Sequence, residues 1–386
     1  FKIIDKTSLY EKALTLLKKI DLNIPLSLLV KDLSPGQKQL VEILKALSTS
    51  SKIIIMDEPT TSLTKKDTRT LFSIIRELKS MGISIIYISH RIEEVLEITD
   101  RIICLRDGQK VGELKTENAN RNILIKMMIG REINEFFPES HKKSKNVIFE
   151  IKELKLKDSP YTINFKLHSG EILGIAGLVG SGRTEIIETI FGIREKKQGK
   201  FFLDNNQIDI NSPVDAINFG IGFVPEDRQL KGLILNLAIK ENITLPYLKN
   251  ISKFGIVNGN EQKSIARSIT KKLNIKSTSI NQTVVNLSGG NQQKIVLGKW
   301  LTLKPKILIL DEPTKGIDVG AKAEIYRMIH NLAEEGVGVI FISSELEEII
   351  GICDRVIVIC EKELRGELLK DEFSEEKIMQ IATGGK

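Results

Sequence analysis

The sequence predicts an α/β protein in which one domain, built on a parallel sheet, occurs twice. A glycine-rich turn at 287–293 opens a helix, and the apolar strand that follows it ends in Asp311 and Glu312. The same two features occur 254 positions earlier, where Asp57 takes the place of Asp311. Strands alternate with amphipathic helices, which favours parallel sheets whose carboxyl ends hold ligands. Together these observations predict two α/β domains that bind phosphate groups.

The repeat extends well beyond these two features. The offset of 254 also maps Ser89 onto Ser343. Because shared composition does not produce a gapless match from Leu33 to Leu114, the pattern indicates the tandem repetition of a whole domain. We therefore expect the C-terminal part of a first domain at 1–137, a polar linker at 138–146 and a second domain at 147–386.

The composition is that of an ordinary globular protein. Of the 386 residues, 41% are hydrophobic and 28% are charged, and the net charge of +7 comes from basic residues interspersed with acids. That interspersion favours a solvated surface and no nucleic-acid partner. No apolar run approaches the roughly 18–20 residues of a membrane span. Cys104, Cys353 and Cys360 lack metal-ligand spacing, so we expect reduced core thiols.

In the first copy, two carboxylates and a histidine follow predicted strands. We expect mixed helix and turn at 1–32, helices at 35–47, 68–80 and 118–135, and strands at 52–56 and 84–89. Asp57 is a candidate Mg²⁺ ligand, and Glu58 is placed to polarise an attacking water. A histidine at a strand end is often structural. His90, however, follows a strand expected beside that of Asp57, so we expect it to reach the same phosphate.

The second copy contains a candidate P-loop. A strand at 170–176 leads into the sequence GLVGSGRT, which fits the pattern Gly-x-x-x-x-Gly-Lys-Ser/Thr except for Arg183. Arginine is longer, planar and forked, so it does not fill the place of lysine in the same way. The Thr184 hydroxyl and Asp311 are candidate Mg²⁺ ligands. The candidate phosphate-binding residues of the loop are Gly177, Gly180, Ser181, Gly182, Arg183, Thr184 and Glu185.

Two further departures lie in the second copy. Glu226 ends a strand where a glutamine that senses the γ-phosphate is expected, and Ser344 occupies the position of His90. Together with Arg183 they predict a site that binds nucleotide but turns it over poorly. Residues 227–286 are expected to form a helical insertion, with a helix at 261–273.

The first copy has no P-loop ahead of its glycine-rich turn. The offset places the counterpart of Arg183 at −71, before the first residue of the sequence. We therefore expect the front of the first domain to be missing, and this chain alone to be only weakly active.

The motifs resemble those of the ATP-binding subunits of ABC importers, specifically the two-domain, single-chain subunits of carbohydrate uptake systems. The ABC signature is matched at 287–293, the Walker B strand and catalytic glutamate at 307–314, and the D-loop at 315–318. The group is also marked by Gly-Arg-Thr-Glu at 182–185, Pro-Glu-Asp-Arg at 225–228 and Ser-Ser-Glu at 343–345. The first signature departs from the usual form, with Pro35 and Gln37 on either side of Gly36. The resemblance covers essentially the whole chain.

This resemblance implies tandem P-loop NTPase domains, each with a parallel-sheet core and a helical subdomain, and ATP with Mg²⁺ as cofactors. In this family the domains pack head to tail, so that each ATP lies between one P-loop and the other signature. The competent site would join Asp57, Glu58 and His90 to Ser288, Gly289 and Gly290. The degenerate site would join the second P-loop, Asp311 and Glu312 to Ser34 and Gly36. Glu226 and Asp318 are further candidate nucleotide contacts.

The resemblance also implies an ATP hydrolase that works with membrane permease subunits and, through them, an extracytoplasmic sugar-binding protein. Such a subunit is peripheral, at the cytoplasmic face of the cell membrane. Alternatives are a nucleoside importer subunit, a soluble twin-ABC ATPase acting on ribosomes or nucleic acid, and a nucleotide-bound regulatory protein without turnover. Arg183 and the short linker argue against the ribosomal class.

Overall fold

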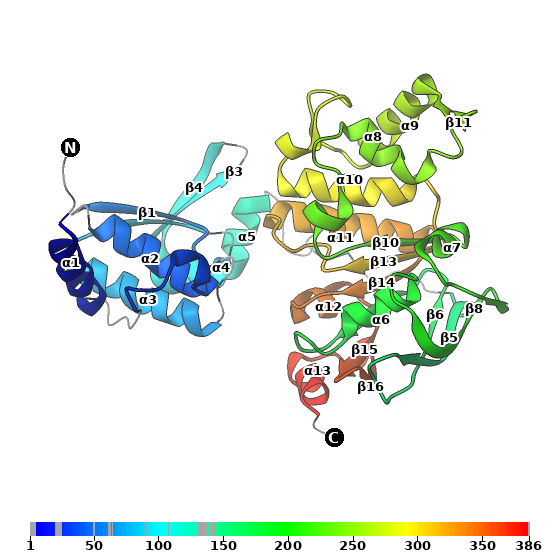
Figure 1. Cartoon of the computed structure of the whole chain (residues 1–386), viewed down its shortest axis with the longest axis horizontal. Coiled ribbons are helices and arrows are strands. Elements are labelled where there is room, and N and C mark those ends of the chain that lie inside the picture. The colour runs from blue at the N-terminus through cyan, green and yellow to red at the C-terminus, as the bar shows by residue number, and fades with distance from the viewer. Residues whose placement is uncertain are drawn as a thin grey trace. The chain divides into compact units, whose positions relative to one another are not determined.

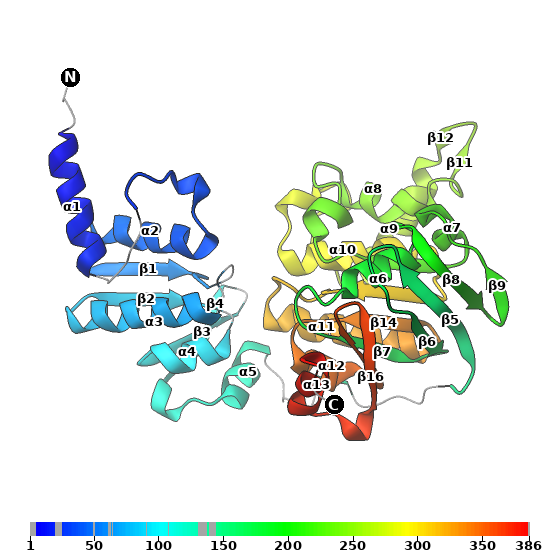
Figure 2. The same cartoon turned by 60° about the horizontal axis from the view of Figure 1, so that its bottom comes forward.

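The computed structural model describes residues 5–19, 25–48, 51–60, 63, 65–89, 91–106, 108–129, 137–138 and 144–384. The chain divides into two compact units, Phe1–Arg131 and Glu132–Lys386. Each unit contains a parallel sheet with helices packed on it (Figures 1 and 2). Separate clusters of buried apolar side chains form the core of each unit.

The first unit is built on two parallel strands. β1 (Ile53–Asp57) and β2 (Ser84–Ile88) pair so that Asp57 lies opposite Ile88. Its other elements are α1 (Lys6–Lys19), η1 (Val30–Asp32), α2 (Pro35–Leu47), α3 (Lys65–Ser80), α4 (Ile92–Ile98), the antiparallel hairpin of β3 (Arg101–Arg106) and β4 (Gln109–Lys115), η2 (Thr116–Asn118) and α5 (Arg121–Ile129). The apolar sides of α2 and α3 pack on Ile54 and Met56. The helix predicted at 118–135 is present as α5, and residues 130–136 lie outside the described residues.

The second unit is organised around a six-stranded sheet in the order β10-β13-β14-β7-β15-β16. Only β16 is antiparallel to its neighbour. β7, β10, β13 and β14 are buried along their whole length, which is why they are continuous apolar runs in the sequence. The strands are β7 (Ile172–Ala176), β10 (Ile221–Val224), β13 (Ile307–Asp311), β14 (Gly338–Ile342), β15 (Arg355–Cys360) and β16 (Glu363–Leu369).

A second, antiparallel sheet was not predicted from the sequence. Its order is β6-β5-β8-β9, from β5 (Val147–Leu156), β6 (Ile163–His168), β8 (Lys196–Leu203) and β9 (Asn206–Ile208). Buried and exposed residues alternate along β6, as expected for a strand with one face in the core. The predicted fold class is therefore correct for the parallel core of this unit, but the prediction did not include the antiparallel sheet.

Helices complete the second unit. Two helices of the predicted insertion, α8 and α9, pack against each other and against α10. The helices are α6 (Arg183–Ile190), α7 (Pro213–Asn218), α8 (Ile239–Thr244), α9 (Gly259–Lys272), α10 (Gly289–Leu301), α11 (Val319–Glu334), α12 (Leu346–Ile352) and α13 (Glu375–Ala382). Shorter elements are the π-helical turn η4 (Arg228–Gly232), η5 (Leu245–Tyr247), η6 (Val284–Asn286), η7 (Lys370–Glu372) and the hairpin of β11 (Ser252–Lys253) and β12 (Ile256–Val257). The hairpin interrupts the insertion, which sequence analysis had taken as helical. In the part of the chain that the structure describes, no helix combines the length and apolar character needed to cross a membrane.

The same sheet face is covered in one unit and open in the other. Ile307 and Ile309 of β13 are fully buried (0% exposed), whereas their counterparts Ile53 and Ile55 in β1 are 60% and 65% exposed. In the second unit this face lies against the antiparallel sheet, since a Cβ on Gly338 would lie 2.5 Å from a methyl carbon of Ile148. No counterpart of that sheet occurs among the described residues of the first unit, so its isoleucines are uncovered within the unit.

This difference makes Ile309→Ala and Ile55→Ala a matched pair. We expect Ile309→Ala to lower the free energy of unfolding of the second unit by about 2–5 kcal/mol, because it leaves a cavity in a closed core. Ile55→Ala should lower that of the first unit by less than about 1 kcal/mol. Hydrogen exchange resolved by peptide, followed in increasing denaturant, measures each unit separately. Equal losses at the two positions would show that the face of β1 is covered in solution.

Candidate nucleotide-binding site

The P-loop joins the buried strand β7 to helix α6. Gly182 precedes the helix with a φ of 102°, in the left-handed region that favours glycine. A Cβ at Gly177 would lie 2.4 Å from the carbonyl oxygen of Ile359, so that position also excludes a side chain. The loop therefore turns tightly onto the start of α6, where the first N–H groups of a helix have no partner within the helix. Such amides bind phosphate oxygens.

The hydroxyl of Ser181 indicates that the loop fits a ligand. Its residue is 6% exposed, and its Oγ has no hydrogen-bond partner among the described residues. A buried hydroxyl without a partner is unfavourable by roughly 1–3 kcal/mol. Oxygen atoms of a phosphate group would satisfy both this hydroxyl and the amides of the loop. The residues present therefore fit a nucleotide phosphate.

Thr184 and Asp311 meet beside the P-loop. The hydroxyl of Thr184 donates to Oδ2 of Asp311 at 3.1 Å, although the two residues are 127 positions apart. Burial, together with the charges of Glu312 and Glu226, raises the pKa of Asp311 to about 7, although the hydrogen bond from Thr184 and the charge of Arg183 lower it. A hydroxyl and a buried carboxylate are suited to Mg²⁺, which usually binds one or two protein oxygens together with phosphate oxygens. The two side chains meet at the carboxyl end of β13.

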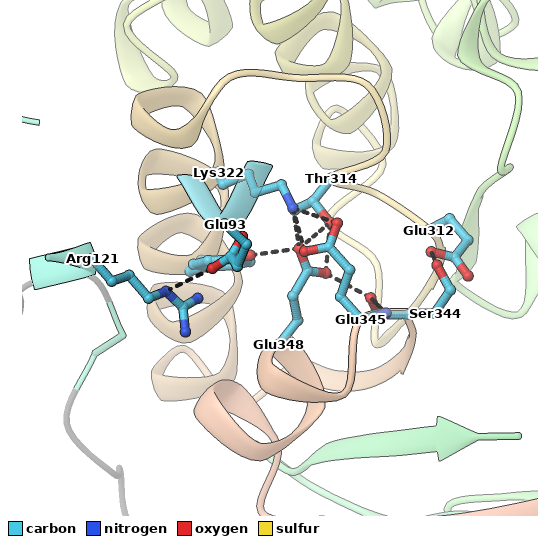
Figure 3. Close-up of polar contacts among 10 residues, drawn as sticks. Glu93, Arg121, Glu312, Thr314, Lys322, Ser344, Glu345 and Glu348 are labelled. Carbon is cyan, nitrogen blue, oxygen red and sulfur yellow. Dashed lines mark hydrogen bonds and ion pairs between the residues drawn. The ribbon is translucent and has the colours of Figure 1, made fainter. Parts of the chain in front are cut away.

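Glu312 follows Asp311 in a strained conformation. Its φ is 48°, which is uncommon for a residue with a side chain, and its N–H donates to the carbonyl of Ile342 at 3.0 Å. The Ser344 hydroxyl donates to Oε2 of Glu312 at 3.1 Å, as Figure 3 shows. Burial raises the pKa of Glu312, against the hydrogen bonds from Ser344 and the charge of Arg183. The carboxylate is therefore held at the end of the sheet.

Arg183 is turned toward the same end of the sheet. It is 8% exposed, and its Nη1 donates to the carbonyl oxygen of Ser343 at 2.9 Å. Its Nη2 lies 3.7 Å from Oε1 of Glu312, within the range of an ion pair but beyond a hydrogen bond. The guanidinium is therefore already engaged by the strand end and the carboxylate that sequence analysis assigned to catalysis.

The glycine-rich turn of the second unit opens α10. Ser288 is the N-terminal cap residue of the helix, and its Oγ accepts a hydrogen bond from Asn291 at 2.9 Å. A Cβ on Gly290 would lie 2.6 Å from the Cβ of Ala321 in α11, so glycine permits the close packing of these two helices. Asp318 caps α11, accepting from the N–H of Ala321 at 2.9 Å. The turn and the D-loop candidate are thus fixed side by side.

Arg228 links these segments, and sequence analysis did not propose it as a functional residue. Its guanidinium donates to the carbonyl oxygens of Lys315 and Gly316, at 2.7 and 3.1 Å. A Cβ on Gly289 would lie 2.7 Å from the same guanidinium. Glu226, which stands where a phosphate-sensing glutamine is expected, forms an ion pair with Lys315 at 2.6 Å. The Pro-Glu-Asp-Arg motif marked the segment, but nothing in its spacing indicated these partners.

Among its described residues, the first unit repeats the end of the strand and contains no P-loop. Asp57 ends β1, Glu58 follows it, and both residues are exposed. The φ of Glu58 is 44°, and its N–H donates to the carbonyl of Ile88 at 2.9 Å, as Glu312 does to Ile342. His90 lies outside the described residues, so its predicted place at this site stays a prediction.

The first glycine-rich turn has a capping box. The N–H of Gln37 donates to Oγ of Ser34 at 3.3 Å, and the Gln37 side chain accepts from the N–H of Ser34 at 3.0 Å. A Cβ on Gly36 would lie 2.8 Å from Cγ of Asp67 in α3, so this glycine also permits close packing. Proline at the first helical position is compatible with this geometry because its missing N–H has no helical partner.

Replacement of Thr184 by valine tests whether the Thr184 hydroxyl is a metal ligand. We expect Thr184→Val to weaken binding of ATP to this chain about tenfold in Mg²⁺, because one ligand to the metal is lost. In EDTA the variant and the parent should bind ATP with nearly equal affinity. Thr189→Val is the matched control, since the Thr189 hydroxyl donates within α6 to the carbonyl of Glu185. Equal weakening with and without Mg²⁺ would contradict the assignment. Fluorescence titration with a labelled ATP analogue provides the affinities.

Solved structures support the fold. A nucleotide-free ATP-binding cassette from an ABC transporter matches with a TM-score of 0.54 at 19% identity, covering 61% of this chain and 98% of that one. The ADP conformation of MJ1267, an ATP-binding cassette of an ABC transporter, matches with a TM-score of 0.52 at 20% identity, covering 62% and 99%. At these identities the likeness concerns the fold alone, and it confirms the predicted α/β ABC ATPase fold.

Sequence comparison gives the family. The family described as ABC transporter matches residues 5–61 and 161–315. A ribose import ATP-binding protein, RbsA, from Streptococcus agalactiae serotype III (strain NEM316) is 46% identical over 386 residues, which are 100% of this chain and 78% of that protein. A xylose import ATP-binding protein, XylG, from Thermoanaerobacter pseudethanolicus (strain ATCC 33223 / 39E) is 46% identical over 392 residues, with the same two coverages. The chain belongs to the ABC transporter family.

Proposed function

We propose that this chain is an ATP-binding and ATP-hydrolysing subunit that energises the import of a monosaccharide or related small sugar through a membrane ABC transporter. The observation that carries the nucleotide chemistry is the hydrogen bond between Thr184 and Asp311 beside the candidate P-loop. Support for the sugar comes from relatives named for ribose and xylose import, which align with the whole chain at about 46% identity.

In the second unit, the residues of the loop bind and orient the nucleotide. The amides at the start of α6 and the Ser181 hydroxyl hold phosphate oxygens. Thr184 and Asp311 hold Mg²⁺, which supplies neutralisation of phosphate charge when bound. Ionisation of Asp311 is required for this, and a nearby cation favours the ionised form. Glu312 is the carboxylate that would polarise an attacking water, but Ser344 and Arg183 hold it.

The two units are proposed to differ in turnover. Glu58 in the first unit has His90 in the corresponding position of its second strand, whereas Glu312 has Ser344. A histidine can contact a γ-phosphate as a charged or hydrogen-bonding group, and a serine is shorter and uncharged. We therefore assign hydrolysis to Glu58 and His90, and nucleotide binding with slow turnover to the second unit.

The proposed partners follow from the same function. An import ATPase must pass its conformational change to subunits that cross the membrane, so we propose permease subunits as direct partners. An extracytoplasmic sugar-binding protein would act through them. The chain would then be peripheral, at the cytoplasmic face of the membrane, with no nucleic-acid partner.

If the two units differ in turnover, the same substitution at the two catalytic glutamate positions should lower the ATPase rate by different amounts. In a transporter whose ATPase subunit contains this chain together with a P-loop for its first unit, Glu58→Gln should lower the ATPase rate by about 100-fold or more, because the group that activates water is lost. Glu312→Gln, the same change at the repeated position, should lower it by less than about fivefold. Steady-state phosphate release with purified transporter measures both. Equal losses would contradict the assignment of hydrolysis to the first unit.

A further inference from the structure

A buried glutamate occupies the same place in both units. Glu348 in α12 is 2% exposed, and Glu94 in α4, its counterpart at the offset of 254, is 8% exposed. Glutamate is rarely buried to this degree unless it is paired. Neither residue belongs to the candidate nucleotide contacts described above, so their burial calls for a different reason.

In the second unit, four side chains surround Glu348. Its carboxylate accepts hydrogen bonds from Thr314 at 2.7 Å, Ser343 at 2.7 Å, Tyr326 at 2.7 Å and Lys322 at 2.9 Å. Figure 3 shows Glu348 with Thr314 and Lys322 directed at it. Thr314 lies two residues after Glu312, and Ser343 lies directly before Ser344. The buried carboxylate therefore joins the segments that follow the ends of β13 and β14.

The first unit has the same arrangement. Glu94 accepts hydrogen bonds from Thr60 at 2.7 Å, Tyr87 at 2.8 Å and Ser89 at 3.2 Å, all at Oε2. Arg91 donates to Oε1 at 3.1 Å. Thr60 lies two residues after Glu58, and Ser89 lies directly before His90 in the sequence.

The phenol donor comes from different positions in the two units. Tyr326 lies on helix α11, and the counterpart of this residue in the first unit is Phe72. Tyr87 lies on strand β2, and its counterpart is Phe341. The rings of Phe72 and Tyr87 are adjacent, with centroids 6.3 Å apart. One phenol thus reaches the glutamate in each unit, from the helix in one and from the strand in the other.

The cation differs in the same way. Lys322 reaches Glu348 from α11, and its counterpart in the first unit is Thr68. Arg91 reaches Glu94, and its counterpart in the second unit is Glu345. The glutamate, the threonine and the serine occupy equivalent positions in the two units. The phenol and the cation come from positions that are not equivalent. A buried carboxylate needs such a set of donors to be stable, and both units provide it.

We propose that Glu94 is a positioning residue for ATP hydrolysis, which fixes the segment after Glu58 to the segment before His90. Glu348 fixes the corresponding segments of the second unit. Glu58 has a left-handed backbone that must be held by its surroundings, and Thr60 is the nearest residue beyond it with a buried side-chain anchor. The inference rests on the proposed function, in which Glu58 and His90 carry hydrolysis.

The first test replaces each glutamate in a transporter whose ATPase subunit contains this chain together with a P-loop for its first unit. Glu94→Gln keeps the shape but replaces one acceptor oxygen by an amide that donates. We expect kcat to fall about tenfold or more, with KM for ATP within about twofold, because misplacement of a catalytic group affects the chemical step. Glu348→Gln should change kcat by less than about threefold. Retention of more than half of kcat by Glu94→Gln, while Glu58→Gln abolishes turnover, would overturn the inference and leave the proposed function intact. Unchanged turnover in Glu58→Gln would overturn both.

The second test moves the phenol donor of the first unit from the strand to the helix, where the second unit has it. It distinguishes an effect on the position of catalytic groups from an effect on the stability of the fold. Tyr87→Phe should lower kcat about threefold or more without changing KM for ATP. Adding Phe72→Tyr, which copies Tyr326 of the second unit, should return kcat to within about twofold of the parent. Thermal unfolding of each variant is recorded alongside. A double variant that regains thermal stability but not kcat would overturn the inference, because the phenol would then only stabilise the fold.

Discussion

One backbone hydrogen bond recurs at the centre of each unit and sets the geometry of the site. The N–H of Glu312 donates to the carbonyl of Ile342, and the N–H of Glu58 donates to that of Ile88. This bond extends the ladder of two parallel strands by one residue beyond the aspartate. The aspartate is thereby held at the strand end, and the glutamate after it leaves the sheet in a left-handed conformation. In the second unit, β14 pairs with β13 on one side and with β7 on the other, and all three strands are parallel. The P-loop that follows β7 therefore begins at the same end of the sheet as Asp311 and Glu312.

The two units then differ in what surrounds this shared framework. In the second unit the carboxylates are enclosed, and Arg183 and Ser344 contact Glu312. In the first unit Asp57 and Glu58 are exposed within the described residues. Thr184 and Arg183 of the P-loop segment lie against these carboxylates in the second unit. The long, forked side chain of Arg183 has its partners, the Ser343 carbonyl and the Glu312 carboxylate, at these strand ends.

The local parts of the site could be predicted from the sequence. The glycine-rich loop, Thr184 and Asp311 belong to short motifs in which spacing and chemistry are coupled, and the structure places them together. Strand β13 was recognised because a fully buried parallel strand is a continuous apolar run. The internal repeat extended these assignments to Asp57 and Glu58, which lie at the end of β1.

Long-range side-chain contacts could not be predicted in the same way. Arg228 meets the carbonyls near Lys315 across 87 residues, and no local pattern indicates such a partner. The antiparallel sheet was missed although β6 alternates buried and exposed residues, and no local pattern indicates that Phe149 of β5 pairs with Leu203 of β8. The buried Glu348 had a usable signal, since it repeats at the same offset as the motifs. Its burial, however, depends on donors that differ between the units.

The left-handed glutamates bear on how the protein could be made more heat-resistant. A non-glycine residue with φ of 48°, as at Glu312, is strained by roughly 1 kcal/mol or more. Glycine or asparagine would relieve that strain, but each would also remove the carboxylate. Stabilisation at these two positions therefore opposes catalytic capacity, and any gain in thermal tolerance has to come from elsewhere in the fold.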